Sequence, residues 1–250
     1  MQAFRFLAPA ALAALAAIST ASCDAGTDAA QPEHGYATGR VVDTGGAPIP
    51  GAKILLDNSV FYASYIHGSS DDAGRYRIRV QPGAWRAHAT IARDYNGRRY
   101  TLQLHPDATD SFDQDGAVRN FSWRLEGRGP DNDYAYYGGF IQLTSDTGFD
   151  GDLADVELVL TPDGPLIDGS AGQQLRLRLN DHYWRQYHQI EDIRIGRYTV
   201  TAVLDDGTGP RPLRIQDGHA RGDFRRQSRL DFIPESGGIP GARASIVIGN

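Results

Sequence analysis

The 250-residue sequence contains only one cysteine and only one lysine. A single cysteine excludes an internal disulfide and a zinc or iron–sulfur site built from several thiolates. The formal net charge is −6, from 25 Lys and Arg against 31 Asp and Glu, and the basic residues are scattered along the chain. The sequence therefore lacks the basic patch of a nucleic-acid-binding protein, and we expect no nucleic acid among its partners.

Common catalytic motifs are also missing. The sequence has no Gly-x-Ser-x-Gly elbow, no His-Glu-x-x-His pair, no phosphate-binding loop and no dinucleotide fingerprint. It is rich in turn formers, with 29 Gly and 13 Pro, and 10% of its residues are aromatic, which favours a turn-rich all-β protein. We therefore expect a non-catalytic protein without a cofactor; the alternative is a hydrolase-type envelope enzyme with its site in an inter-domain cleft.

Residues 1–22 have the layout of an export signal: one basic residue, Arg5, then an apolar run over residues 7–18, then small residues. The run has 12 residues, whereas a membrane-spanning helix needs about 20, so we expect a signal peptide. The junction Thr20-Ala-Ser-Cys23 resembles the lipobox of bacterial lipoproteins, which implies a diacylglycerol on the thiol of Cys23. Thr20 replaces the usual aliphatic residue, and the alternative is ordinary signal-peptidase cleavage that leaves a free thiol.

Residues 23–35 contain almost nothing that a core would bury, which predicts a flexible tether. Together with the lipid, the tether would hold a folded body near a membrane surface. We therefore expect a protein of the cell envelope of a Gram-negative-type bacterium, on the periplasmic face and anchored by its lipid to the inner or outer membrane.

Residues 36–126 consist of short β-rich runs separated by turn clusters such as residues 43–51. Apolar side chains alternate with arginines over residues 75–80, so one face of that strand is buried and the other lies in water. Four blocks are similar to the carboxypeptidase regulatory-like domain: GRVVD (39–43), GAPIPGAKI (46–54), SDDAGRYRI (70–78) and PGAW (82–85). The resemblance implies a transthyretin-like sandwich of seven strands that serves as a non-catalytic module on exported proteins.

The second half of the chain repeats this pattern more loosely. Residues 139–143, 156–160 and 195–202 have the character of residues 39–41, 53–55 and 82–85, and leucines alternate with polar residues over 175–180. We predict a linker over residues 127–136 and a second sandwich over residues 137–250. The expected fold is all-β, with two antiparallel Ig-like or transthyretin-like β-sandwiches in tandem.

Two aromatic clusters are the candidate ligand-binding sites. The first lies in the longest insert of the second half, residues 181–192, and the second lies at the domain junction; their candidate residues are His182, Trp184, Tyr187, His188, Tyr134, Tyr136 and Tyr137. Flat rings among polar groups suit a glycan or an envelope protein as partner. The alternative is that these rings only pack, in the insert against the end of the sandwich and at the junction between the two sandwiches.

Two further readings are disfavoured by the sequence. His182, His188 and Glu191 match no zinc spacing, and the acidic loops near residues 113–116 and 150–152 do not fit a calcium loop, so we expect no metal site. Lys53, the only lysine, lies between two residues expected to face the core. Strand alternation therefore directs it to solvent, which argues against an isopeptide bond with Asn120.

Overall fold

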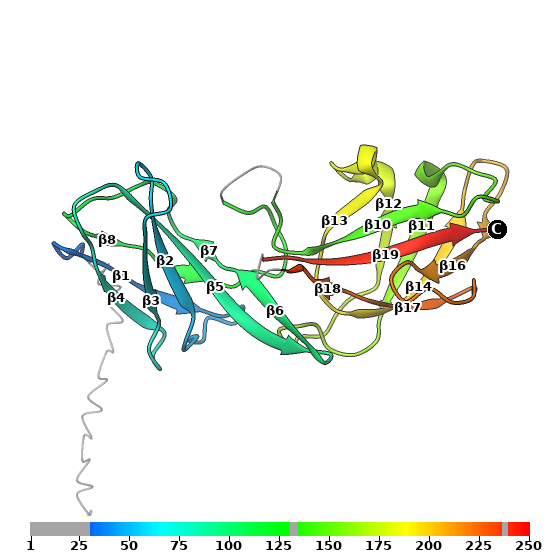
Figure 1. The fold of residues 1–250 in the computed structure, drawn as a ribbon. Coiled ribbons are helices and arrows are strands. Elements are labelled where there is room, and N and C mark those ends of the chain that lie inside the picture. The colour runs from blue at the N-terminus through cyan, green and yellow to red at the C-terminus, as the bar shows by residue number, and fades with distance from the viewer. Residues whose placement is uncertain (1–30, 131–134, 237–239) are drawn as a thin grey trace, which may run out of the picture.

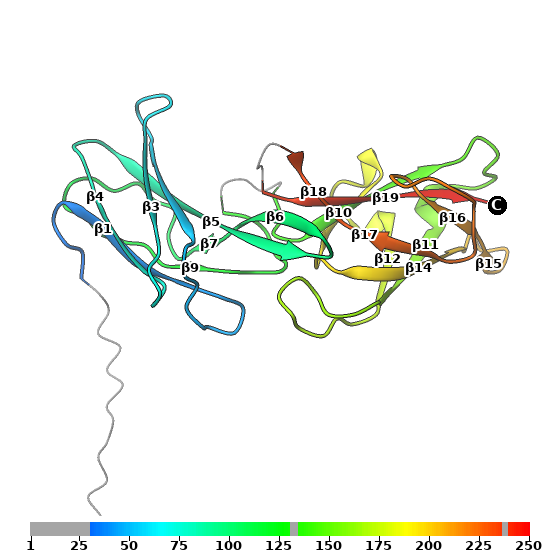
Figure 2. The same cartoon turned by 60° about the horizontal axis from the view of Figure 1, so that its bottom comes forward.

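The computed structural model describes residues 31–130, 135–236 and 240–250. Their strands form two β-sandwiches that lie end to end in an elongated molecule (Figures 1 and 2). The predicted all-β fold of two tandem sandwiches is confirmed. Within the described residues the helices are three short 3-10 turns, η1 (Leu153–Asp155), η2 (Leu179–Asp181) and η3 (Arg185–Tyr187). None of the helices in this part of the chain is long and apolar enough to cross a membrane.

The first sandwich packs one sheet of order β4-β1-β9-β7, with β8 beside β1, against a second sheet of order β3-β2-β5-β6. Its strands are β1 (Tyr36–Val42), β2 (Lys53–Asn58), β3 (Tyr65–Ser69), β4 (Arg75–Arg79), β5 (Trp85–Tyr95), β6 (Arg98–Gln103), β7 (His105–Pro106), β8 (Ala117–Val118) and β9 (Phe121–Ser122).

The second sandwich packs a sheet of order β13-β10-β19-β16, with β18 beside β19, against a sheet of order β12-β11-β14-β15, with β17 beside β14. Its strands are β10 (Gly139–Ser145), β11 (Val156–Pro162), β12 (Leu175–Arg178), β13 (Gln189–Ile193), β14 (Arg197–Leu204), β15 (Arg211–Pro212), β16 (Arg214–Asp217), β17 (Ser228–Asp231), β18 (Ile233–Pro234) and β19 (Ala242–Gly249).

The two sandwiches share one strand topology. β1 pairs with β4, β2 pairs with β3 and β5, and the corresponding strands of the second sandwich pair in the same way: β10 with β13, and β11 with β12 and β14. Most pairs are antiparallel, as predicted. The first strand of each sandwich, however, runs parallel to strands late in the same sandwich: β1 pairs with β8 and with β9, and β10 pairs with β19. Parallel pairing depends on long-range crossovers, which strand periodicity does not reveal.

Alternation of side chains along the strands fills both cores. In β4 the tyrosine and isoleucine are buried and the three arginines are exposed, as the sequence predicts. Three buried tyrosines, here called the buried phenols, are Tyr76, Tyr100 and Tyr198, with 5%, 1% and 1% of their surface exposed. Gly74 has φ +70°, and a Cβ there would lie 2.6 Å from the carbonyl oxygen of Val41, so this turn requires glycine.

Two of the longer strands, β3 and β13, lie in segments where no strand was predicted. In β3 the inward positions include Gly68, whose missing side chain makes room for Ile78, so the run lacks the apolar signal of a strand. β13 contains two acidic residues and a β-bulge, and it occupies the end of the segment that the sequence suggested was a long connection. The short strands β8 and β9 are separated at Asn120, whose side chain accepts from the backbone N–H of Arg40 and donates to the carboxylate of Asp107.

Direct contacts join the two sandwiches. The hydroxyl of Tyr100 in β6 donates to the carbonyl of Phe232 at 2.7 Å, and that of Tyr95 in β5 donates to the carbonyl of Pro165 at 2.8 Å. The guanidinium of Arg194 forms a two-pronged ion pair with Glu126. These bonds hold the end of the first sandwich against the second and define the junction between them.

Candidate functional site

The aromatic segment 181–192 lies at this junction and is built from η2, η3 and β13. The ring of Trp184 contacts the rings of Tyr183 and Tyr187, with centroids 5.2 and 5.4 Å apart. Trp184 is half-buried, whereas Tyr183 and Tyr187 are 47% and 58% exposed. The guanidinium of Arg128 lies over the rings of both Tyr136 and Tyr183. The segment is therefore partly packed, by its tryptophan, and partly presented to solvent, by its tyrosines.

A β-bulge in β13 sets the direction of the acidic side chains. Gly139 pairs with Ile193 and Ile141 with Ile190, so β13 carries one residue more than β10 between these pairs. Asp192, in the bulge, has a positive φ of 65°, a conformation that aspartate tolerates better than most residues. Its carboxylate accepts hydrogen bonds from the backbone N–H of Gly127 at 2.8 Å and of Gly138 at 3.3 Å. Asp192 therefore ties the inter-sandwich connection to β13. Burial holds the pKa of its carboxyl above the ordinary value, and the two backbone hydrogen bonds offset only part of that rise.

Glu191 is buried beside this bulge, with 7% of its surface exposed. Its Oε1 accepts a hydrogen bond from the backbone N–H of Tyr183 at 2.6 Å. Its Oε2 has no hydrogen-bond partner, and Nδ1 of His182 lies 3.5 Å away, beyond the usual hydrogen-bond distance. One oxygen of a buried carboxylate is therefore unsatisfied.

A cavity of about 390 Å³, here called the edge pocket, opens between β12 and β13. Leu175 and Leu177 of β12 line one side, and Glu191 and Ile193 of β13 line the other. The corresponding edges of the first sandwich, β3 and β4, are in contact, because glycine in β3 admits an isoleucine of β4. The second sandwich is therefore open at the edge between β12 and β13, whereas the first is closed at the corresponding edge between β3 and β4.

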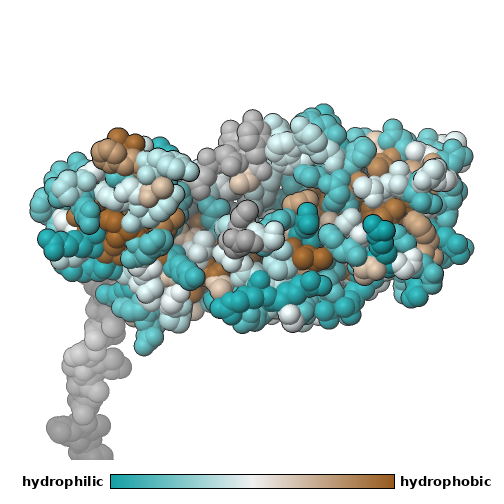
Figure 3. All heavy atoms as spheres, viewed as in Figure 1, coloured by the Kyte–Doolittle hydropathy of each residue, from teal (hydrophilic) through white to brown (hydrophobic). Residues whose placement is uncertain are grey.

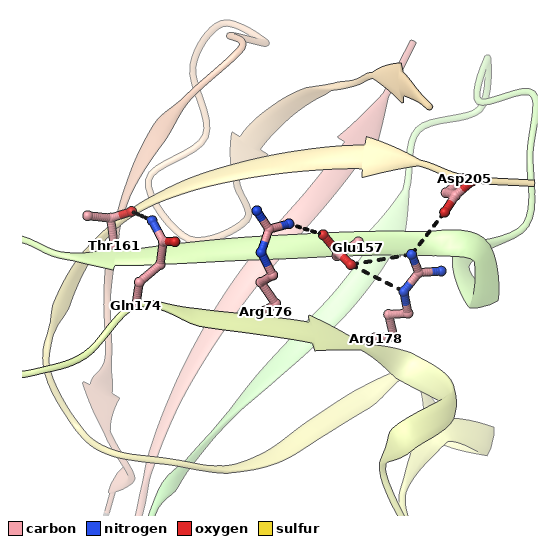
Figure 4. Close-up of polar contacts among 6 residues, drawn as sticks. All are labelled: Glu157, Thr161, Gln174, Arg176, Arg178 and Asp205. Atoms are coloured by element: carbon pink, nitrogen blue, oxygen red, sulfur yellow. Dashed lines mark hydrogen bonds and ion pairs between the residues drawn. The ribbon is translucent and has the colours of Figure 1, made fainter. Parts of the chain in front are cut away.

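The wall of the edge pocket is held from its outer side. Figure 4 shows side chains of β12 and the residue before it reaching across the solvent face to β11 and to the residue after β14. The bonds are Gln174 to Thr161 (2.9 Å), Arg176 to Glu157 (2.5 Å), Arg178 to Glu157 (3.3 Å) and Arg178 to Asp205 (3.1 Å). Alternation along β12 places these polar groups outside and the two leucines inside.

A second cavity, of about 380 Å³ and here called the junction pocket, shares Tyr136, Glu191 and Asp192 with the edge pocket. Its aromatic lining is Tyr136, Tyr137, Phe140 and Trp184, and its polar side chains are Gln103, Gln189, Glu191, Asp192 and Glu235. The hydroxyl of Tyr137 lies 2.9 Å from Nδ1 of His105, and burial lowers the pKa of that histidine. The junction pocket thus combines aromatic rings, amides and carboxylates.

The structure brings several of the predicted site residues together. Tyr136, Tyr137 and Trp184 line the junction pocket, and His182 and Tyr136 line the edge pocket. Two others, Tyr187 and His188, are exposed and line neither pocket. Their backbone carbonyls accept hydrogen bonds from the side-chain amide of Gln142. The remaining two, Cys23 and Tyr134, lie outside the described residues.

Sequence reasoning missed the roles of Glu191 and Asp192. It considered Glu191 only as part of a metal triad with His182 and His188, and within the described residues no group of three or more His, Cys, Asp or Glu side chains could hold a metal. The acidic loops are turns in which Asp113 and Asp152 each accept a backbone N–H two residues ahead. A non-alternating pair of acids next to aromatic residues was the only signal in the sequence for the bulge.

Comparisons with known proteins add little. No family model matches the sequence, and no curated protein matches it. The Bacillus anthracis TIE protein has 10% identity and a TM-score of 0.35 over 86% of this chain and 33% of its own, so this chain spans one third of that protein. A C-terminal fragment of the pilus adhesin SpaC from Lactobacillus rhamnosus GG has 10% identity and a TM-score of 0.26, over 86% of this chain and 96% of the fragment. These values assign no family, and the resemblance to the carboxypeptidase regulatory-like domain stays a prediction.

Proposed function

We propose that this protein is exported, is held in the bacterial cell envelope by a lipid on Cys23, and binds a glycan without catalysis at the junction pocket. The observation that carries the proposal is the lining of that pocket, in which four aromatic rings face amides and carboxylates. Sugar rings stack on flat aromatic faces, and their hydroxyls bond to carboxylates and amides, so this combination suits a glycan.

A binding role is favoured over hydrolysis by the side chains present. Among the described residues that line the two pockets there is no Ser, Thr or Cys to act as the nucleophile of an acyl-transfer hydrolase. His182 and Glu191 lie together, but they lack a hydroxyl or thiol partner in the edge pocket. A hydrolase that depends on a Ser, Thr or Cys nucleophile therefore has only part of the required set of groups.

Tryptophan fluorescence provides a direct test of glycan binding. Trp85 and Trp123 are 3% and 6% exposed, so a change in acrylamide quenching on adding sugar would report Trp184. We expect one member of a panel of neutral, amino and acidic oligosaccharides to protect Trp184 from the quencher, and Trp184→Ala to weaken binding measured by calorimetry. Tyr62→Ala, at a fully exposed tyrosine of the first sandwich, is the matched control. Equal affinity of the Trp184→Ala variant and the wild type would contradict the proposal.

The lipid anchor needs a separate test, because Cys23 lies outside the described residues. We expect intact-mass measurement of the membrane fraction to show a diacylglycerol on a chain that begins at Cys23, and Cys23→Ser to release the protein from membranes. An unmodified N-terminus on the mature protein would overturn the lipid anchor and leave the glycan proposal untouched.

A second candidate function is binding of an envelope protein through the loop between β2 and β3. In this loop Val60, Phe61 and Tyr62 are 69%, 64% and 100% exposed, and Figure 3 shows hydrophobic surface at that tip of the first sandwich. Asn58 holds the loop by accepting the backbone N–H groups of Val60 and Phe61. An exposed apolar tip suits a protein partner. This candidate is ruled out if Phe61→Ser leaves cross-linking of the protein in the native envelope unchanged.

A further inference from the structure

The edge pocket is lined by a buried carboxylate, that of Glu191, of which one oxygen accepts no hydrogen bond. The side chain of Glu191 is 9% exposed, and its Oε2 has no hydrogen-bond partner. Burial of an ionised carboxylate is costly unless the charge is paired and its oxygens accept hydrogen bonds. Oε2 has less than 1 Å² of accessible surface, so a bound group supplies the missing hydrogen bond when the Glu191 carboxylate turns toward the pocket that this residue lines.

The other charges of the pocket leave an excess of negative charge. Its lining includes three carboxylates, on Glu126, Glu191 and Asp192, and one guanidinium, on Arg194. Arg194 is paired with Glu126, and the carboxylate of Asp192 accepts backbone N–H groups. His182 faces Oε2 of Glu191 from 3.5 Å and can add a positive charge only when it is protonated. The pocket is therefore complementary to a cation.

The remaining walls are apolar and select the shape of that cation. Leu175 and Leu177 line the pocket from β12, and Leu166, Ile193 and Tyr198 complete the apolar surface. Such walls exclude a hydrated metal ion, which requires several oxygen ligands. They suit a ligand with an aliphatic stem that ends in a small hydrogen-bond donor, because the stem buries apolar area while the donor bonds to the carboxylate.

We propose that the edge pocket binds a primary alkylammonium group on an aliphatic stem, with the Glu191 carboxylate turning toward the pocket so that the ammonium donates to Oε2. A lysine side chain of another molecule and a free alkyl amine share this chemistry. The inference goes beyond the proposed glycan site, because it concerns the neighbouring cavity and a different ligand group.

Calorimetry on the full chain tests the ligand chemistry. The probes are n-pentylamine, 1-pentanol and pentanoate, which share a stem and differ in their end group. We expect pentylamine to bind and the alcohol and the anion to bind at least about tenfold more weakly, the factor expected for a hydrogen bond to a charged group. Nα-acetyl-lysine methylamide distinguishes the sources: stronger binding than pentylamine identifies a lysine residue, and weaker binding identifies a free amine. Absence of amine binding, or equal binding of alcohol and amine, overturns the proposal.

Two variants locate the site. Glu191→Gln keeps the shape of the side chain and removes its charge, and it is expected to weaken amine binding at least about tenfold. Asp72→Asn makes the same change of charge at an exposed turn of the first sandwich and should leave binding unchanged. Unchanged affinity in a folded Glu191→Gln protein overturns the assignment; if this variant does not fold, the comparison of amine with alcohol on the wild type decides. Trp184→Ala should weaken glycan binding and spare amine binding, so the two proposals fail separately.

Discussion

The hydrogen bond from Tyr100 to Phe232 joins the two sandwiches, and removing it should destabilise both. Tyr100 is 1% exposed, and its hydroxyl donates to the carbonyl oxygen of Phe232 at 2.7 Å. Burial raises the pKa of Tyr100 to about 12, so the phenol is a protonated donor at neutral pH. Tyr100→Phe keeps the ring and its packing and removes only the hydroxyl, which leaves the carbonyl without its phenol donor.

The expected cost follows from that geometry. A buried acceptor that loses its partner costs about 1–3 kcal/mol of unfolding free energy, and we expect about 2 kcal/mol here because donor and acceptor belong to different sandwiches and no neighbouring strand replaces the bond. With a urea slope of about 3 kcal/mol per M, the midpoint of denaturation should fall by about 0.7 M.

Urea denaturation followed by tryptophan fluorescence and by circular dichroism measures this shift. Tyr62→Phe is the matched control, because Tyr62 is fully exposed and its hydroxyl has no packing to lose. We expect this control to stay within about 0.5 kcal/mol of the wild type, as surface substitutions usually do. A Tyr100→Phe variant as stable as the control would refute the reasoning, because it would mean that the bond contributes nothing to the junction.

Three further predictions concern stability. Ser70→Ala removes a buried hydroxyl that donates to the carbonyl of Ile49 and accepts from the N–H of Ala52, and should cost about 2–4 kcal/mol in thermal or urea unfolding, whereas the exposed Ser69→Ala should cost little. Gly138→Ala places a Cβ 2.6 Å from the backbone of Asp192 and should lower the melting temperature, while Gly148→Ala, in open space, should not. The buried phenols have pKa values raised by burial, so the folded state keeps protons that the unfolded state loses above about pH 10. Their contribution should be complete below pH 10 and then decline by up to about 1.4 kcal/mol per pH unit per phenol; flat stability from pH 9 to 11 in urea titrations would contradict this.

Strand positions were largely predictable because their signal is local. The alternation in residues 75–80 and the leucine alternation over 175–180 both appear in the structure as strands or their continuation, with the expected residues facing inward. Lys53 is exposed, as its position between Ala52 and Ile54 predicts. In each case the period of two that defines a strand is present within a few adjacent residues.

The sequence predicted the segments that form the candidate site, but not the roles of individual residues in it. The sequence singled out residues 181–192 and the junction aromatics, and three of the aromatics named there, Tyr136, Tyr137 and Trp184, line one cavity. The unsatisfied carboxylate of Glu191 was not predictable, because its burial depends on a bulge opposite β10 and on the separation of β12 from β13. Neither feature has a local pattern.

The sequence by itself determined the all-β class and the two runs of strands, since these depend on composition and on contacts between near neighbours; the export signal with its cysteine stays a prediction. Tertiary structure alone decided which strands pair in parallel, which edge of each sandwich is closed and which carboxylate is left without a partner. The closed edge results from Gly68 packing against Ile78, and the open edge forms the edge pocket beside Glu191. Such features depend on contacts between residues far apart in the chain, and short-range periodicity carries no information about those contacts.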